Sequence, residues 1–250
     1  MDFNFYTTDV FTDQLFGGNP LAVFPEAAGL NDEQMQLIAR EFNISETIFV
    51  FPPEDAAHTA RVRIFTPARE LDFAGHPTVG CAFMLATLGQ VELTGAITEI
   101  VLEENVGPVP VKIFTDAAGN VTKTELSAAK MPESLEGAPS ADILAQVLSL
   151  EPEDILEGSL SPEVVTAGVP FLFVPVKNRE ALGRSAVNLA QWREHLEDTV
   201  ARDMFIFCFD PELEGSNVRA RMYAPSMGIA EDPATGAAAT AFAGYLAKRA

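Results

Sequence analysis

The 250-residue chain is poor in basic residues, cysteine and histidine. Its 16 lysine and arginine residues stand against 36 acidic ones, which gives a formal net charge of -20 at pH 7. Such a charge argues against nucleic acid or an anionic membrane surface as the partner. It does not argue against a small anionic ligand, because backbone N–H groups can override the overall field inside a dry cleft.

Several motifs that would define other functions are missing. No CxxC or His/Cys cluster indicates a metal site, and no GxGxxG, Walker loop or G-x-S-x-G elbow indicates a nucleotide or a hydrolase triad. Cys81 and Cys208 lie in apolar segments and are expected to be buried thiols. There is no signal-peptide pattern and no uncharged run of transmembrane length. We therefore expect a cytoplasmic protein without a metal or a nucleotide cofactor.

An internal duplication is the main positive signal. Residues 76–80 (HPTVG) and 232–236 (DPATG) share one pattern. Two more pairs match in the same order and at nearly the same separation, namely 18–23 with 168–174 and 61–67 with 219–225. The separation is far too long for a solenoid repeat. The chain is therefore predicted to hold two homologous domains, residues 1–125 and 126–250.

Each half contains one segment without a polar face, residues 79–88 and 237–246, which is typical of a buried helix. The predicted fold is α+β, with two domains that each wrap a β-barrel-like sheet round such a helix. Strands are predicted at residues 3–10, 21–24, 47–51, 61–65, 97–102, 109–114, 164–176 and 204–209. Helices are predicted at 31–42, 141–149, 151–156 and 189–196, with caps at Asn31 and Ser140. Residues 116–139 are predicted to connect the domains. Strands follow only the first buried helix, so we expect the second domain to lack its last strands and the chain to be incomplete.

Both repeated loops lead into the buried helices. Proline suits the first turn of a helix, where its missing N–H is not needed. The helix N-terminus offers unpaired N–H donors and the positive end of the helix dipole. Two such loops are predicted to bind one anion. Gly75, Gly80 and Gly236 allow close backbone approach, or else serve only turn geometry and packing.

Three side chains could carry the chemistry. Glu46 lies between a predicted helix and an apolar strand, where partial burial favours the protonated form of a carboxylate and suits a general acid or base; it could also be a solvated loop residue. His76 could exchange a proton with a ligand or only hold its loop. Asp232 could cap the second buried helix, bind an ammonium group, or do both.

Other polar residues are expected to lie at the surface. Arg63 and Arg221 are predicted to be outward-facing strand charges, and His58 and His195 to be exposed.

Residues 16–23, 45–47, 75–78 and 231–236 together resemble the PhzF-like family of phenazine biosynthesis, which has the diaminopimelate epimerase-like fold. The resemblance covers nearly the whole chain. It implies two similar domains with the site in the cleft between them. It also implies a cofactor-free isomerase that is usually a homodimer.

By position, Glu46 matches the family's acid/base, which moves a proton between ring carbons of a dihydro-hydroxyanthranilate, and His76 and Asp232 match its other polar active-site residues. The residues expected to contact the substrate are Asn19, Ser45, Gly75, Pro77, Thr78, Thr235, Gly236 and Ala237. The family often has a serine in place of Ala237, and the missing hydroxyl argues against the phenazine precursor as the substrate. The related racemases place a cysteine on each loop; this chain has none there, which argues against a two-thiol epimerase.

The predicted function is a cofactor-independent isomerase that moves a proton between carbons of a small carboxylate. One alternative is an amino-acid racemase or epimerase that uses Glu46 and His76 from opposite faces of the substrate. A second is a non-catalytic protein that binds a small acid. A third is an interaction protein in which the duplication is only structural.

Overall fold

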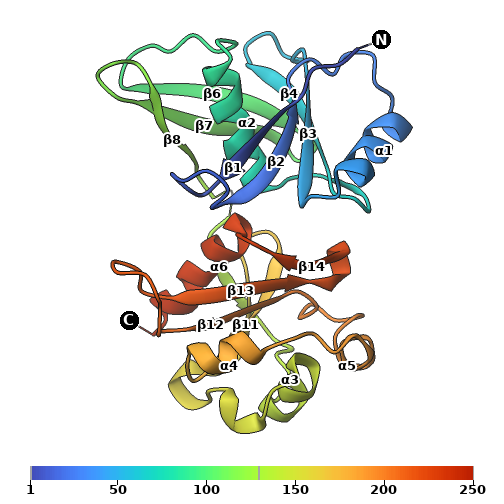
Figure 1. The fold of residues 1–250 in the computed structure, drawn as a ribbon, viewed down its shortest axis with the longest axis vertical. Coiled ribbons are helices and arrows are strands. Elements are labelled where there is room, and N and C mark those ends of the chain that lie inside the picture. Colours follow the sequence, from blue (N-terminus) through green and yellow to red (C-terminus); the bar gives the residue numbers. More distant parts are fainter. Residues whose placement is uncertain (1, 129, 250) are drawn as a thin grey trace. The chain divides into compact units, whose positions relative to one another are not determined.

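The computed structural model describes residues 2–128 and 130–249 (Figure 1). The chain forms two compact units, Met1–Ser127 and Ala128–Ala250, each with its own sheet and helices. No helix within the described residues is both long and apolar enough to cross a membrane.

The first unit is built on an eight-stranded sheet in the order β1-β2-β3-β4-β6-β7-β8, with β5 paired to β4. Its strands are β1 (Tyr6–Val10), β2 (Asn19–Phe24), β3 (Glu46–Phe51), β4 (Ala60–Phe65), β5 (Glu70–Leu71), β6 (Ile97–Glu104), β7 (Gly107–Thr115) and β8 (Val121–Leu126). The pairs β2–β3 and β4–β6 are parallel, and the other pairs are antiparallel.

Helix α2 (Gly75–Thr87) is the core of this unit. It contacts β1, β2, β3, β7 and β8, so the sheet curls round it (Figure 1). Ten of its 13 residues are buried, which confirms the prediction of a helix without a polar face. The helix begins at Gly75, four residues before the predicted start at Val79, and so includes residues 75–78 of the repeated loop.

Helix α1 (Asp32–Phe42) covers the opposite face of β3. The side chain of Asn31 accepts from Gln34 N at 2.9 Å, and Gln34 Oε1 accepts from Asn31 N at 3.0 Å, which confirms the predicted cap. Met35 of the helix packs in one cluster with Phe49 of the strand. The helix ends where Asn43 adopts a left-handed conformation (φ 51°), after which the chain turns into β3.

The second unit has a six-stranded sheet in the order β14-β13-β12-β11-β10-β9. Its strands are β9 (Glu133–Leu135), β10 (Glu163–Thr166), β11 (Pro170–Pro175), β12 (Met204–Cys208), β13 (Arg219–Ala224) and β14 (Ile229–Asp232). Its helices are α3 (Ala141–Leu148), α4 (Arg179–Arg184), α5 (Leu189–His195) and α6 (Gly236–Ala247), with short 3-10 turns at Pro152–Asp154, Gly158–Leu160 and Pro225–Met227.

The helices of this unit cover both faces of its sheet (Figure 1). Successive strand residues point to opposite faces. Phe171 and Phe173 of β11 pack in the cluster that contains α6, while Leu172 and Val174 pack in the cluster that contains α3, α4 and α5.

The two sheets repeat one series of strand pairings. In both β1 to β5 and β10 to β14 the pairings run antiparallel, parallel, antiparallel and antiparallel. The repeated segments 61–67 and 219–225 lie at β4 and β13. In each unit the last strand of the series leads into the apolar helix, α2 or α6.

Some sequence predictions are wrong in detail. Residues 116–139 contain β8 and β9 instead of a plain connection. These strands are polar and short, so their periodicity is weak, and β8 is stabilised by pairing with β7 and packing on α2. Helix α6 is less buried than predicted, because Ala239, Ala243 and Ala247 are exposed. His195 is half-buried. Cys81 and Cys208 are buried free thiols, as predicted, and burial raises the pKa of Cys81.

Candidate active site

Glu46 and His76 form a hydrogen-bonded pair within the first unit. Glu46 Oε2 lies 2.7 Å from His76 Nδ1, and the two side chains are only 13% and 5% exposed. A carboxylate can only accept, so Nδ1 carries the hydrogen when Glu46 is ionised. The lone pair of the neutral ring then lies on Nε2. The pair therefore combines a partly buried carboxylate with a fixed imidazole, which is the equipment for moving a proton.

The start of β3 positions Glu46. It is the first residue of the strand, directly after the buried Ser45, and it is in register with Leu21 of β2. Because strand residues alternate, Glu46 faces the same side as Ile48, which packs in the core round α2. Asn19, two residues before Leu21, faces this side too and is fully buried. Both strands thus begin with a polar side chain directed towards α2.

The first turn of α2 positions His76. Its Nε2 is buried and has no hydrogen-bond partner among residues 2–128 and 130–249. The ring centroid of Phe11 lies 6.3 Å from that of the imidazole. A buried nitrogen without a partner is costly. Nε2 is therefore the atom of this pair that we expect to meet a ligand.

The remaining predicted residues of the first loop share this turn. Pro77 and Thr78 are buried. A Cβ added to Gly75 would come no closer than 3.8 Å to Leu126 Cδ2, so packing does not demand a glycine there. A Cβ on Gly80 would lie 2.6 Å from Leu21 Cδ2, so Gly80 serves helix–sheet packing.

The second loop has a different local structure. Asp232 is the last residue of β14, and it accepts a hydrogen bond from the hydroxyl of Thr235. Helix α6 starts at Gly236 with Thr235 in the cap position, so the suggested capping by Asp232 is wrong. Pro233 lies ahead of the helix instead of in its first turn. Ala237 follows Gly236 in that turn and is half-buried.

An arginine–glutamate pair holds the strand before each loop. Arg63 Nε and Nη2 lie 2.7 and 2.6 Å from the carboxylate oxygens of Glu70, and Arg221 makes the same two contacts with Glu231 at 2.8 and 2.7 Å. The arginine side chains are 18% and 24% exposed, so the prediction of outward-facing charges is wrong. Two parallel N–H···O bonds match the guanidinium to the carboxylate. In each pair the arginine lowers the pKa of its glutamate.

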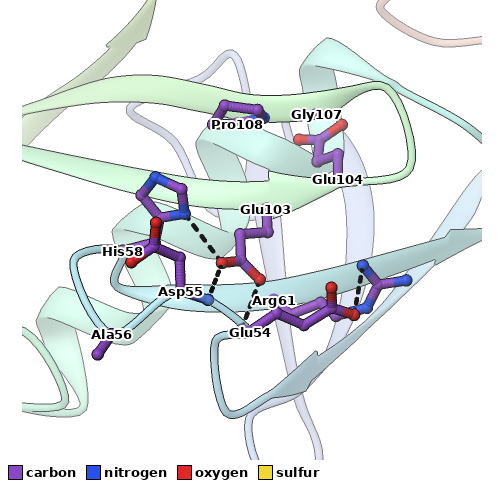
Figure 2. A pocket seen from close by; sticks show the side chains of 9 residues that line it. All are labelled: Glu54, Asp55, Ala56, His58, Arg61, Glu103, Glu104, Gly107 and Pro108. Carbon is purple, nitrogen blue, oxygen red and sulfur yellow. Dashed lines mark hydrogen bonds and ion pairs between the residues drawn. The ribbon is translucent and has the colours of Figure 1, made fainter.

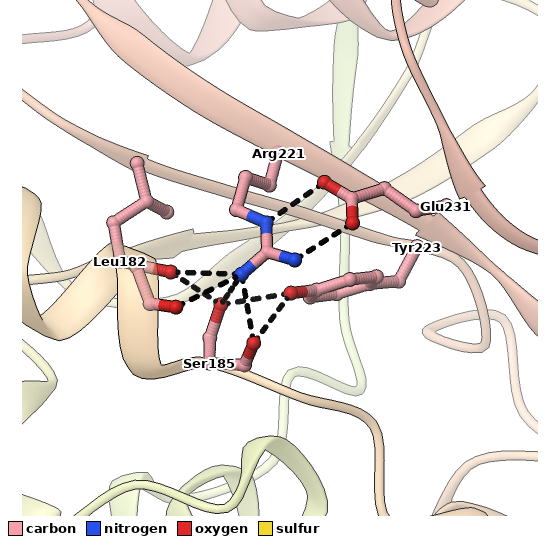
Figure 3. A network of polar contacts seen from close by, with 6 residues as sticks. Leu182, Ser185, Arg221, Tyr223 and Glu231 are labelled. Carbon is pink, nitrogen blue, oxygen red and sulfur yellow. Dashed lines mark hydrogen bonds and ion pairs between the residues drawn. The ribbon is translucent and has the colours of Figure 1, made fainter.

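The pair in the second unit belongs to a larger network (Figure 3). Arg221 Nη1 donates to Leu182 O at 3.2 Å and to Ser185 O at 2.8 Å, and the hydroxyl of Tyr223 donates to Ser185 O at 2.7 Å. Glu231 is the residue directly before Asp232. Sequence reasoning missed this arrangement, although the repeated Arg-x-Arg pattern followed by an acidic residue before each loop was a usable signal.

A separate hollow of about 560 Å³ lies beside His58 and Glu103 (Figure 2). Glu103 accepts from Glu54 N and Asp55 N, both at 2.8 Å, and lies 2.9 Å from His58 Nδ1. The two backbone N–H groups lower the pKa of Glu103 to about 2, with a smaller contribution from His58. This carboxylate therefore anchors a loop and stays ionised. His58 is bonded instead of freely exposed, contrary to the prediction. No cluster of metal-binding side chains occurs in the described part of the chain.

The family model for phenazine biosynthesis-like proteins, PhzC-PhzF, matches residues 8–250. The chain belongs to the PhzC-PhzF family. An uncharacterized isomerase from Mesorhizobium japonicum is 40% identical over 246 residues, covering 97% of this chain and 80% of that protein. The trans-2,3-dihydro-3-hydroxyanthranilate isomerase from Pseudomonas aeruginosa is 34% identical over 244 residues, covering 96% of this chain and 78% of that protein.

Solved structures of the family agree with the fold. The crystal structure of the Bacillus anthracis phenazine biosynthesis protein of the PhzF family matches with a TM-score of 0.86 at 29% identity, covering 98% of this chain and 80% of that one. The predicted family, the α+β diaminopimelate epimerase-like fold and the isomerase class are thereby confirmed.

Proposed function

We propose that this PhzC-PhzF family member is a cofactor-independent isomerase in which Glu46 moves a proton between two carbons of a small carboxylate. The Glu46 carboxylate takes the proton from one carbon, and the electron pair passes into the neighbouring unsaturated system. Glu46 then returns the proton at another carbon, so the enzyme ends as it began. His76 holds Glu46 in place and directs Nε2 to the substrate.

The buried 2.7 Å contact between Glu46 and His76 carries this proposal. It fixes the carboxylate that would shuttle the proton, and a positioned acid or base contributes roughly 10²- to 10⁴-fold to a rate. The same contact counts against a racemase in which these two residues act from opposite faces of one carbon. Groups that are hydrogen-bonded to each other cannot lie on both sides of a substrate.

The second loop is also proposed to bind substrate. Asp232 would bind its amino group, while the N–H groups at Gly236 and Ala237 would bind a carboxylate. Asn19, Ser45, Gly75, Pro77, Thr78 and Thr235 are the further residues proposed to line the site. Backbone N–H groups at the start of a helix favour an anion because of their geometry and the helix dipole.

The substitution Glu46→Gln tests the mechanism. It keeps the side-chain shape but removes the basic oxygen, so we expect turnover to fall by about 10³-fold or more while substrate binding persists. The first substrate to assay is trans-2,3-dihydro-3-hydroxyanthranilate, on which the Pseudomonas relative acts, followed by a panel of small unsaturated amino and hydroxy acids. Solvent deuterium uptake, followed by NMR, reports the proton shift itself.

Glu41→Gln is the matched control, because Glu41 is an exposed glutamate on α1. Full turnover by Glu46→Gln on a substrate that the native enzyme converts would show that another group moves the proton. Binding of an acid without turnover by the native protein would favour the non-catalytic alternative. Inversion of a stereocentre without movement of a double bond would favour an epimerase.

Two further proposals concern the assembly of the protein, for which the family suggests a dimer, and its cellular compartment. We propose a homodimer, which light scattering coupled to gel filtration tests directly. The two buried free thiols support a reducing compartment, and we propose the cytoplasm.

A further inference from the structure

Glu104 is a buried carboxyl group that the proposed reaction does not use. It is the last residue of β6, is only 3% exposed, and has a polar atom, Oε2, that is buried without a hydrogen-bond partner within residues 2–128 and 130–249. Its other oxygen, Oε1, lies 2.5 Å from Thr78 Oγ1 in the first turn of α2. The nearby backbone N–H of Ala74 has a lowering effect on the pKa of this carboxyl group.

The helix start needs such a partner. Ala74 is the cap residue of α2, and its methyl group makes no side-chain cap hydrogen bond. A helix whose first N–H groups lie in a protein interior must find acceptors elsewhere. Glu104, at the end of another strand, places a carboxyl group beside this helix start and contacts Thr78 of its first turn.

The hydrogens of this cluster can be counted. Thr78 Oγ1 lies 2.6 Å from Ala74 O as well as 2.5 Å from Glu104 Oε1. A hydroxyl group has one hydrogen, and a carbonyl oxygen can only accept. Both contacts are satisfied together only when Thr78 donates to Ala74 O and Glu104 carries a proton that it donates to Thr78. The geometry therefore selects the neutral acid.

The rest of the hairpin reinforces the same segment. Val106 N donates to Asp72 O at 3.1 Å, and Asn105 Nδ2 donates to Glu70 at 3.0 Å. Consecutive residues of the β6–β7 hairpin thus bind the chain from β5 to the first turn of α2. His76 lies inside this bound segment, between Ala74 and Thr78.

We propose that Glu104 is a positioning residue that, as a neutral carboxyl group, fastens the β6–β7 hairpin to the first turn of α2 and so holds His76 against Glu46. This inference rests on the proposed role of the Glu46–His76 pair. Loss of the proton from Glu104 places a buried charge beside Thr78 and loosens the turn.

The electrostatic surroundings support the neutral form. Burial raises the pKa of Glu104 to about 7, against the lowering effect of its bonds with Thr78 and Ala74. On α2, Cys81 is the titratable neighbour, and its thiol stays protonated because burial raises its pKa too. The titratable and charged residues that line the adjoining hollow with Glu104 are Glu54, Asp55, His58, Arg61 and Glu103 (Figure 2). No basic residue of the described chain forms an ion pair with Glu104.

The test compares Glu104→Gln with Glu104→Ala in the full chain and needs no substrate. Glutamine mimics the neutral acid, because it carries no charge and its amide N–H can donate to Thr78 Oγ1. The measured quantities are the backbone amide NMR signals of Ala74, Gly75 and Thr78 from pH 5 to pH 9 and the hydrogen exchange of the same amides. The native protein should show a step near pH 7 in these signals and smaller protection factors, relative to intrinsic exchange, above it.

In Glu104→Gln the step should vanish, and the protection factors should stay constant over the whole range. In Glu104→Ala the same amides should exchange at least tenfold faster than in the native protein at pH 5. A step near pH 7 that persists in Glu104→Gln would assign it to another group and overturn the proposal. So would equal exchange in the alanine and glutamine variants. With a substrate that the native enzyme converts, Glu104→Gln should also keep its kcat above pH 7, where the native enzyme loses activity. A Glu46→Gln variant with undiminished turnover would challenge the proposed function alone, and not the role of Glu104.

Discussion

At the residue scale, two glycines of one helix have opposite reasons for lacking a side chain. Gly80 faces Leu21 and Val10, whose methyl groups would lie 2.6 and 2.7 Å from an added Cβ. An added Cβ on Gly75 would make only an ordinary contact, 3.8 Å from Leu126 Cδ2, and Gly75 lies next to His76. Packing therefore explains the first glycine, and proximity to a ligand is the reason that we assign to the second.

The variants Gly75→Ala and Gly80→Ala should separate these reasons. Gly80→Ala overpacks the helix–sheet contact and should lower the free energy of unfolding by about 1–3 kcal/mol. Gly75→Ala should leave it unchanged or raise it by up to about 1 kcal/mol, because alanine is the better helix former. Urea denaturation measures both. Under conditions where both variants are folded, a binding assay with the identified substrate should show weaker binding for Gly75→Ala and unchanged binding for Gly80→Ala. Unchanged binding by Gly75→Ala would remove Gly75 from the site.

At the element scale, the arginine–glutamate pairs join neighbouring strands just before the two loops. Arg221 of β13 binds Glu231 of β14 and, through Nη1, the carbonyl groups at the end of α4. Lysine has a single ammonium group and cannot reproduce these parallel bonds. Because Glu231 precedes Asp232, the pair sets where the strand delivers that carboxylate.

Arg221→Lys should therefore cost about 1–2 kcal/mol of stability, as expected for the loss of charge-assisted hydrogen bonds at a half-buried site. It should also reduce kcat/KM through displacement of Asp232. Arg219→Lys is the control on the same strand, because Arg219 is exposed and makes only a 3.6 Å contact with Glu212. Chemical denaturation and steady-state kinetics measure the two effects. Equal changes in stability and in kcat/KM for Arg221→Lys and Arg219→Lys would mean that the bidentate pair with Glu231 is dispensable.

At the scale of the whole molecule, the acidic excess and one buried acid act in the same direction. At pH 7 the net charge is -20, and the like charges repel one another in the folded state. The net charge falls in magnitude as the pH is lowered towards the isoelectric point near pH 4.4. Glu104 binds its proton more tightly in the folded chain than in the unfolded one, since its pKa is raised from 4.5 to about 7. Its stabilising effect is complete below pH 4.5 and is lost as the pH rises through 7.

The free energy of unfolding should therefore be higher at pH 5.5 than at pH 8. The Glu104 contribution to this difference is at most ~2 kcal/mol, from 1.4 kcal/mol per pH unit between pH 5.5 and its pKa of about 7. Salt should reduce the part of the difference that comes from net charge, because exposed charges are screened over about 8–10 Å at moderate ionic strength. Glu104→Gln should remove the part that salt leaves. Denaturation curves at both pH values, with and without 0.5 M salt, test this; greater stability at pH 8 would contradict it.

On the acidic side Asp154 stabilises the folded chain through a lowered pKa, as Glu103 and Glu163 do. Burial alone would raise its pKa, but the bonds with Lys177 at 2.5 Å and Arg184 at 2.7 Å lower it to about 2. Its contribution is present above pH 4 and is lost only as the pH falls through 2.

The linear sequence determined the local features, because they depend on near neighbours. The cap at Asn31, the apolar helix from Val79 onward and the strand over residues 47–51 follow from spacing and side-chain type alone. The repeated segments also predicted a repeated series of strands, since similar sequences fold alike. The polar strand β8 escaped this reasoning, because its stability comes from pairing with β7.

Only the tertiary structure decided which side chains meet. Glu46 and His76 are 30 residues apart, and Thr78 and Glu104 are 26 apart, yet both pairs are in hydrogen-bond contact. The sequence Glu103-Glu104 does not indicate that Glu103 anchors a loop while Glu104 is a buried acid. Burial and hydrogen-bond partners make that difference, and both are properties of the packed chain, not of the order of its residues.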